Sequence, residues 1–230
     1  MESLLTHPGA PSSRRDFFKR AGVGVGAFAA IATLQACDSE GNSDDADATL
    51  DFSSDVGVLN YAYALEQLEA EFYARVIANG AFATAFNADE QAILRDIAAH
   101  EALHDDFFRI AITAAAPTQI IPRLTVDFST INFGNRTNVL AVAQTFEDLG
   151  VSAYNGAGKY IQSDEYLTLA GKIVSVEARH ASIIAGLISP NSVASAGQLD
   201  ANGLDKDKTP QAVIAAASTY IVETIAVTNT

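Results

Sequence analysis

The stretch AAHEALHDD, residues 98–106, contains two overlapping metal-binding patterns. Taken as HExxH, it places His100 and His104 on one zinc ion, with Glu101 as a general base. Taken as ExxH, it supplies only Glu101 and His104, which are half of a two-metal site in a helical bundle. The rest of the chain has to decide between these two interpretations.

A second copy of the shorter pattern favours ExxH. Glu177-Ala-Arg-His180 repeats the spacing of Glu101-Ala-Leu-His104, but Val176 stands where HExxH would require its first histidine. Three residues at 100° each place Glu and His within about 60° of one another on a helix, so both can face the core. Two such helices can offer two carboxylates and two imidazoles to one site.

Two further segments carry a glutamate followed by a tyrosine. Glu66 stands seven residues before Tyr73, and Glu147 stands seven residues before Tyr154. Glu69 lies about 60° from Glu66 on a helix and could replace it, but the tyrosine spacing favours Glu66. We expect the tyrosines to fill the core beside the site, each with a hydrogen bond at its hydroxyl. The order along the chain is therefore Glu, ExxH, Glu, ExxH.

Apolar residues recur at the helical period through most of the chain, which predicts an all-α fold. Asn79-Gly80 is a good helix stop, and Asn87 with Glu90 is typical of an N-terminal cap. Glycines at 150, 156 and 158 each weaken the third helix by up to about 1 kcal/mol, so we expect close packing or a bulge there. We expect four long helices at about 56–79, 88–116, 137–162 and 163–188, and a short C-terminal helix from Thr209-Pro210 to about Ala226.

Residues 117–136 (PTQIIPRLTVDFSTINFGNR) interrupt the helical period with two prolines and many β-branched residues. Twenty residues without a helix are unusual inside a compact domain. One type of four-helix bundle requires such a crossover, and an extended segment of this length easily spans the roughly 30 Å of a bundle. We therefore predict a long crossover between the second and third helices.

The N-terminal segment PSSRRDFFKRAGVGVGAFAAIATLQACDSE, residues 11–40, resembles a twin-arginine export signal. Its apolar run, 21–34, is shorter than the roughly 20 residues of a permanent membrane span. Cys37 follows Leu34-Gln-Ala, which resembles a lipobox and implies cleavage before a lipid-modified Cys37; the alternative is ordinary cleavage after Ala36. We expect an exported protein at the periplasmic or outer face of the cell envelope. The expected domains are a signal (1–36), an acidic flexible tether (37–52), the bundle (53–190), and a C-terminal loop and helix packed on it (191–230).

The charge balance excludes one class of partner. The chain carries a net charge of −14, and removal of residues 1–36 leaves 10 basic and 26 acidic residues, a net charge of −16. Such a surface repels nucleic acid and anionic headgroups, so we expect no nucleic-acid partner and membrane contact only through the lipid at Cys37. Cys37 is the only cysteine, so neither an internal disulfide nor a thiolate metal site is expected.

From about Val56 to Ile188 the chain resembles the ferritin-like superfamily of di-iron and di-manganese carboxylate four-helix bundles. The signal, the crossover and the C-terminal appendage are similar to those of exported ferritin-like domains related to desiccation-associated proteins. The resemblance implies a centre of two divalent metal ions, iron or manganese, that reacts with dioxygen or hydrogen peroxide as a catalase-like or ferroxidase-like oxidoreductase. The residues that it implies as ligands and catalytic groups are Glu66, Glu101, His104, Glu147, Glu177 and His180, with Tyr73 and Tyr154 behind them.

Electrostatics gives an independent reason for two cations. Four carboxylates in one helical core would repel one another and lose their hydration, and two divalent ions supply the +4 that balances them. Carboxylate oxygen with imidazole nitrogen suits iron or manganese. Two alternatives stay open: a non-catalytic ferritin-like scaffold for stress protection or binding at the envelope, and, more remotely, an HExxH zinc metalloprotease. An extended protease motif would need Gly and His where Phe107 and Ile110 stand.

Among the three histidines that follow the expected signal, one has no assigned role in this scheme. His100 lies about 40° from His104 on the helix, so it either supports the site from behind or is partly exposed, and we expect exposure.

Overall fold

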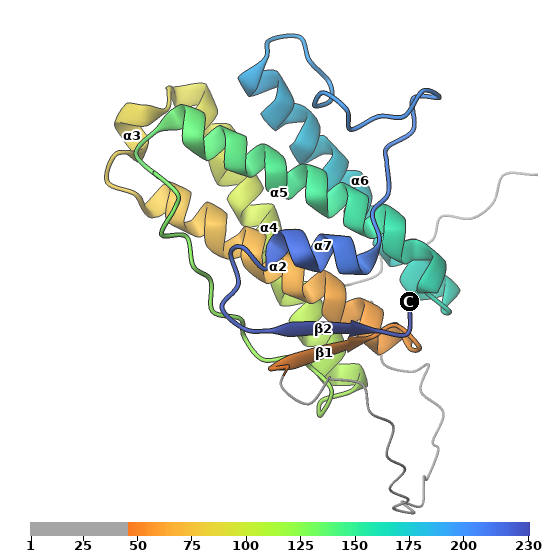
Figure 1. Ribbon diagram of the computed structural model, residues 1–230. Coiled ribbons are helices and arrows are strands. Elements are labelled where there is room, and N and C mark those ends of the chain that lie inside the picture. Colours follow the sequence, from red (N-terminus) through yellow and green to blue (C-terminus); the bar gives the residue numbers. More distant parts are fainter. Residues whose placement is uncertain (1–45) are drawn as a thin grey trace, which may run out of the picture.

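Four long helices packed in pairs form the body of the molecule (Figure 1). The computed structural model describes residues 46–230, so the expected signal and Cys37 lie outside the described residues. Helix α2 packs along α4 and α5 packs along α6, while α2 also contacts α5. The predicted all-α four-helix bundle is confirmed. The long helices are α2 (Asp55–Ala78), α4 (Ala88–Ala115), α5 (Arg136–Ala157) and α6 (Asp164–Ile188).

The helices begin where short polar side chains satisfy their first backbone N–H groups. Asn87 Oδ1 accepts a hydrogen bond from Glu90 N–H, and Glu90 Oε2 accepts one from Asn87 N–H, which completes the expected capping box of α4. Ser163 caps α6 with a single bond, in which its hydroxyl oxygen accepts from Tyr166 N–H. The connection between α2 and α4 holds one short helix, α3 (Phe82–Ala85).

The predicted crossover runs along the outside of the bundle from the end of α4 to the start of α5 (Figure 1). Its backbone is held by two buried polar side chains of α2. Asn60 donates to Gln119 O at 2.8 Å and accepts from Ile121 N–H at 2.9 Å, and Gln67 accepts from Leu124 N–H at 2.7 Å. These bonds replace the backbone partners that an extended segment packed on a helix would otherwise lack.

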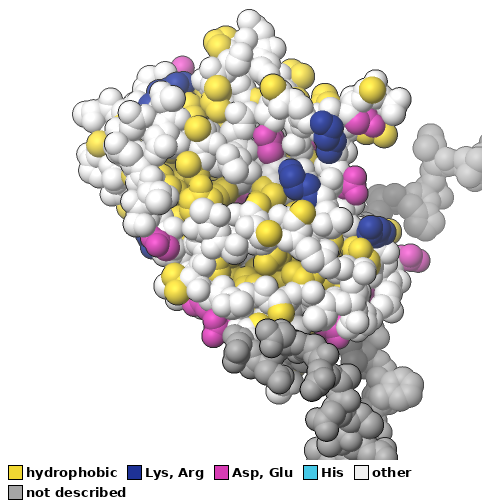
Figure 2. Space-filling view, in the orientation of Figure 1, with side chains coloured by type: hydrophobic (Ala, Val, Ile, Leu, Met, Phe, Trp, Pro, Cys, Tyr) yellow, Lys and Arg dark blue, Asp and Glu magenta, His cyan; other side chains and the backbone are white. Residues whose placement is uncertain are grey.

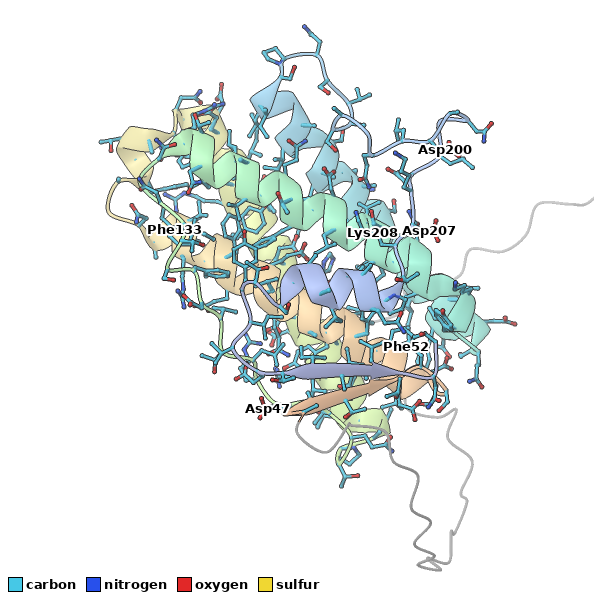
Figure 3. The ribbon with its side chains drawn as sticks, in the orientation of Figure 1. Asp47, Phe52, Phe133, Asp200, Asp207 and Lys208 are labelled. Atoms are coloured by element: carbon cyan, nitrogen blue, oxygen red, sulfur yellow. The ribbon has the colours of Figure 1, made fainter. Side chains whose placement is uncertain are left out.

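A two-stranded parallel sheet was not expected. Strand β1 (Ala48–Asp51) pairs with β2 (Ile225–Thr228), so the two ends of the described chain lie side by side. Leu50 and Phe52 are buried, and Figure 3 shows Phe52 beside the sheet. The prediction of a flexible tether to residue 52 is therefore wrong for residues 48–52. The alternation of buried and exposed residues from 48 to 52 is the strand pattern that the acidic composition obscured.

The C-terminal helix is shorter than predicted. Helix α7 (Pro210–Ala217) begins at the expected Thr209-Pro210 but ends nine residues before Ala226. The segment that follows is rich in β-branched residues and bridges to the crossover through Ile221 and Val126 before it forms β2. The extended conformation is more favourable than a helix for this segment, because β-branched side chains lose rotamer freedom in helices.

Helix α5 also ends earlier than predicted, and a 3₁₀ turn, η1 (Gly158–Tyr160), follows it. A Cβ at Gly156 would lie 1.8 Å from the carbonyl oxygen of Lys208, so only glycine allows the C-terminal segment to cross α5 at this point. Figure 3 shows Lys208 beside α5. Close packing, one of the two expectations for these glycines, holds at Gly156.

Acidic and basic side chains lie singly on the face drawn in Figure 2, and no histidine reaches the surface there. Across the described residues, no helix combines the length and apolar character that a membrane crossing requires.

Candidate metal centre

The four long helices bring the six expected ligands together in the middle of the bundle. Their oxygen and nitrogen atoms form two groups, in each of which the ligand atoms lie within 4.8 Å of one another. The four carboxylates are 0% exposed and His180 is 4% exposed. The first group is Glu66, Glu101, His104 and Glu177, and the second is Glu101, Glu147, Glu177 and His180.

The two groups overlap through the carboxylates of the ExxH motifs. Glu101 and Glu177 belong to both groups, whereas Glu66 and Glu147 each belong to one. If each group held one ion, Glu101 and Glu177 would be available to both ions, and each ion would also have one further, terminal carboxylate and one imidazole.

Unpaired polar atoms support the same division. Both oxygens of Glu101 and of Glu177, and one oxygen each of Glu66 and Glu147, are buried without a hydrogen-bond partner among the described residues. The Nδ1 atoms of both histidines are also unpaired. Buried polar atoms are nearly always satisfied in native proteins, so a convergent set of eight is a strong indication of a bound ion.

The remaining oxygens of the terminal carboxylates are held by tyrosines from the opposite helix. Tyr73 of α2 donates to Glu147 Oε1 of α5, and Tyr154 of α5 donates to Glu66 Oε1 of α2. The expected hydrogen bond at each tyrosine hydroxyl is present, and its partner lies on the other helix. This reciprocal pair leaves one unpaired oxygen on each of Glu66 and Glu147, and each residue has a ligand atom within 4.8 Å of the other ligand atoms of its group.

The imidazoles approach the carboxylates closely without making regular hydrogen bonds. His104 Nδ1 lies 2.9 Å from Glu177 Oε1 and 3.3 Å from Glu66 Oε2, and His180 Nδ1 lies 2.7 Å from Glu101 Oε1. Both Nδ1 atoms are buried and have no hydrogen-bond partner among the described residues. Atoms that converge on one point in this way are placed as ligands to a common ion rather than as donors and acceptors to one another.

Burial and mutual repulsion shift the titration of these groups. Burial raises the pKa of Glu66 and of Glu147 to about 7. Burial also opposes ionisation of Glu101, but its contacts with His104 and His180 outweigh burial and lower the pKa of Glu101 to about 2. Burial alone would lower the pKa of each imidazole, yet carboxylate contacts raise the pKa of His104 to about 12 and that of His180 to about 10. All of these shifts favour the binding of positive charge among the carboxylates, which agrees with the prediction from the sequence.

A fifth buried acidic side chain, which is not among the six expected ligands, lies beside the site. Glu69, considered above only as a substitute for Glu66, is 3% exposed, and its Oε1 would lie 3.2 Å from a Cβ at Gly150. The absence of a side chain at Gly150 therefore makes room for this carboxylate. Burial and then the charge of Glu177 raise the pKa of Glu69 well above its usual range. The sequence showed that Glu69 could reach the core but gave no sign that both acids would do so.

His100 is exposed, as expected, yet it also contacts the site. Its Nδ1 lies 2.9 Å from Nε2 of His180, and the two rings stack with centroids 5.1 Å apart. This partner lies on α6, so no local spacing in the sequence could reveal it. His100 belongs to neither ligand group, whereas Glu101 contributes to both. The arrangement therefore does not favour the HExxH interpretation, which needs His100 as a ligand and Glu101 as a free base.

The donor set fits two divalent cations. Four carboxylates balance two divalent charges, and the oxygen and imidazole donors suit iron or manganese, whereas structural zinc usually takes cysteine ligands. Fold and donor set together define a ferritin-like helical bundle with a candidate dimetal site. A family model described as a ferritin-like domain matches residues 54–190, and the chain belongs to this family. A search of curated proteins found no match.

Proposed function

We propose that this chain is an exported dimetal carboxylate protein, with iron or manganese, that acts as an oxidoreductase on peroxide or dioxygen. The observation that carries the proposal is the convergence of eight unpaired buried ligand atoms on two overlapping positions. A site that only stabilised the fold would not need four buried carboxylates, since apolar side chains fill a core at a lower desolvation cost.

Two adjacent metal ions, when bound, can exchange two electrons with an O–O unit. The residues of this chain prepare that chemistry. Glu101 and Glu177 would bind at both ion positions. The two tyrosines fix the terminal carboxylates by hydrogen bonds, and His100 orients the ring of His180. The burial of all four carboxylates limits water at the centre, which strengthens every charge interaction there. Whether the activity is catalase-like or ferroxidase-like depends on the metal and the substrate.

The location of the protein is part of the proposal. The twin-arginine pattern at Arg14 and Arg15, the short apolar run after it and Cys37 support export to the periplasmic or outer envelope face, with a lipid on Cys37. The acidic surface supports a small-molecule partner, peroxide or dioxygen, rather than nucleic acid.

The decisive experiment measures metal and activity together. We would purify the protein exported by its own host, determine its metal content by elemental analysis, and assay oxygen evolution from peroxide and oxidation of ferrous iron. The expected result is about two ions of iron or manganese per chain and one of the two activities. Glu147→Ala removes one terminal ligand and should abolish the activity.

The matched control is Glu165→Ala, which removes an exposed glutamate from the start of α6 and should leave metal content and activity unchanged. Normal activity in Glu147→Ala would refute the dimetal mechanism. Failure of the exported protein to bind any metal would instead support the non-catalytic scaffold.

A further inference from the structure

An apolar pocket with a volume of about 90 Å³ lies between the candidate metal centre and the surface of the bundle. Its outer wall reaches the surface on α4, where Ala114 is exposed and Ile110 is 39% exposed. Its inner wall contains residues four positions from a ligand on the same helix, and such residues share a face about one turn, or roughly 6 Å, apart. These are Ala62 before Glu66, Phe108 after His104 and Ile173 before Glu177. The pocket therefore extends from the surface to within about one turn of the ligands.

The wall of the pocket has few groups that could bind a polar molecule. The only charged side chain in it is Asp55. The carboxylate of Asp55 already accepts hydrogen bonds from the backbone N–H groups of Gln162 at 2.7 Å and Ser163 at 3.1 Å. This carboxylate is therefore already paired where the helices α5 and α6 are joined.

Three tyrosines are the other polar side chains of the wall: Tyr61, Tyr154 and Tyr166. The Tyr61 hydroxyl is buried and does not face the open space, and the Tyr154 hydroxyl already donates to Glu66. This leaves at most the hydroxyl of Tyr166, which is partly exposed, for a polar molecule. Apolar spaces inside proteins hold water poorly and take up apolar gases such as xenon.

The pocket lies nearer to one ion position than to the other. Tyr154 lines the pocket, is partly exposed and is bonded to Glu66 of the first group. Its counterpart Tyr73 is 0% exposed and does not line the pocket. The imidazoles differ in the same direction, since the side chain of His104 is 13% exposed and that of His180 is 5% exposed. A molecule that enters through the pocket would therefore reach the first group, which contains Glu66 and His104, before the second.

We propose that this pocket is the route by which dioxygen reaches the first ion position, and that its apolar wall selects dioxygen over hydrogen peroxide. This inference rests on the proposed function and names the oxidant of that site. Dioxygen makes no strong hydrogen bonds with water, so it loses little on entering an apolar space, whereas hydrogen peroxide would lose hydrogen bonds at both of its oxygens. The pocket has room for about six to nine water-sized groups, so it is a passage for a small gas and not a close-fitting site.

The first test uses xenon, an apolar atom that shows where a small gas can enter, on protein stripped of metal with a chelator. Binding is measured by xenon NMR and by the shifts that xenon causes in the methyl signals of the protein. We expect saturable binding, with shifts at residues of the pocket such as Leu65 and Ile173. Ala170→Phe places a ring in the wall at a partly buried position and should abolish this binding, whereas Ala141→Phe adds the same ring at an exposed position of α5 and should not.

The second test compares the two oxidants on protein loaded with ferrous iron. Stopped-flow absorbance measures the second-order rate constant for oxidation of the iron by dioxygen and, in a separate anaerobic experiment, by hydrogen peroxide. Ala170→Phe should lower the rate constant for dioxygen by about 10-fold and leave the metal content and the rate constant for peroxide unchanged. A variant with a damaged metal centre would instead lose both reactions. Ala141→Phe should change neither rate constant.

A second variant of the wall guards against misfolding. Ala114→Phe, at the exposed outer end of the pocket, should have the same effects as Ala170→Phe to a smaller degree, and it replaces that variant if Ala170→Phe does not fold.

The outcomes separate this inference from the proposed function. Protein from its own host that holds no metal but still binds xenon in the pocket would refute the proposed function, and the route to the centre with it. Metal-loaded protein that reacts with dioxygen but takes up no xenon in the pocket, or whose dioxygen reaction is unchanged by Ala170→Phe, would overturn the inference alone. Equal losses of rate with the two oxidants would overturn the selection of dioxygen.

Discussion

The two helix pairs, α2 with α4 and α5 with α6, contribute the same types of ligand to the site, but only one pair adds a further buried acid. Each pair supplies a glutamate, a tyrosine seven residues later and an ExxH motif. Three residues after the terminal glutamate, however, α2 carries Glu69 and α5 carries Gly150. Gly150 provides the space that the Glu69 carboxylate occupies, so a fifth buried acid is accommodated on one side only. The repetition creates two ion positions, and the difference makes their surroundings unequal.

The largest expected effect tests what the two helix pairs share. Glu101 contributes to both ion positions, whereas Glu66 contributes to one. Glu101→Ala should therefore reduce the metal content from about two ions per chain to almost none, and Glu66→Ala should leave about one. Elemental analysis after dialysis against buffer measures both. Equal metal content in the two variants would show that the carboxylates are not divided into shared and terminal ligands.

The second prediction concerns the free energy of unfolding of the metal-free protein, which should depend on pH through the matching carboxylates of the two helix pairs, Glu66 and Glu147. The pKa values of Glu66 and Glu147 are both raised to about 7, so the ionised form of each carboxylate destabilises the folded state of the metal-free protein. The free energy of unfolding should therefore fall as pH rises from about 5 to 8, by on the order of 3 kcal/mol per carboxylate. Urea unfolding of chelator-treated protein across this range measures the change.

The two histidines change stability in the same direction, and Glu101 does not change it in that pH range. The raised pKa values of His104 and His180 give stability that is complete below about 6.5 and declines as pH rises towards about 10 to 12. The lowered pKa of Glu101 matters only below about 4.5. Metal-loaded protein should show the opposite trend, with stabilisation by metal that grows with pH, because ions displace the protons. A metal-free protein that is more stable at pH 8 than at pH 5 would contradict this account.

A smaller effect is expected at the reciprocal tyrosines. Tyr73→Phe frees one oxygen of Glu147, and Tyr154→Phe frees one oxygen of Glu66. Each change should lower the affinity of one ion position by about 10- to 100-fold, since groups that orient metal ligands have effects of this size. Competitive titration with a chelator measures both affinities. A loss in one variant and none in the other would show that the two halves are not equivalent here.

The sequence predicted what depends on local spacing and missed what depends on contacts between distant segments. The order Glu, ExxH, Glu, ExxH and the helical period predicted the bundle, and the extended stretch from 117 to 136 predicted the crossover. The pairing of β1 with β2 was missed because each strand is short and its partner lies at the other end of the described chain. The contact between His100 and His180 and the space that Gly150 provides for Glu69 were also missed, because in each case the two residues lie far apart in the sequence.

The smallest expected effect tests the additional buried acid that α2 carries and α5 lacks. Two divalent ions balance four ionised carboxylates, so a fifth ionised acid would leave an uncompensated buried charge. The pKa of Glu69, raised well above its usual range by burial and by neighbouring carboxylates, indicates that this side chain is neutral. Gln is close in shape to a protonated Glu, so Glu69→Gln should keep both ions and change the unfolding free energy by less than about 1 kcal/mol, whereas Glu66→Gln should lose an ion. If Glu69→Gln instead loses metal as readily as Glu66→Gln, Glu69 is itself a ligand, and α2 supplies two carboxylates to the centre where α5 supplies one.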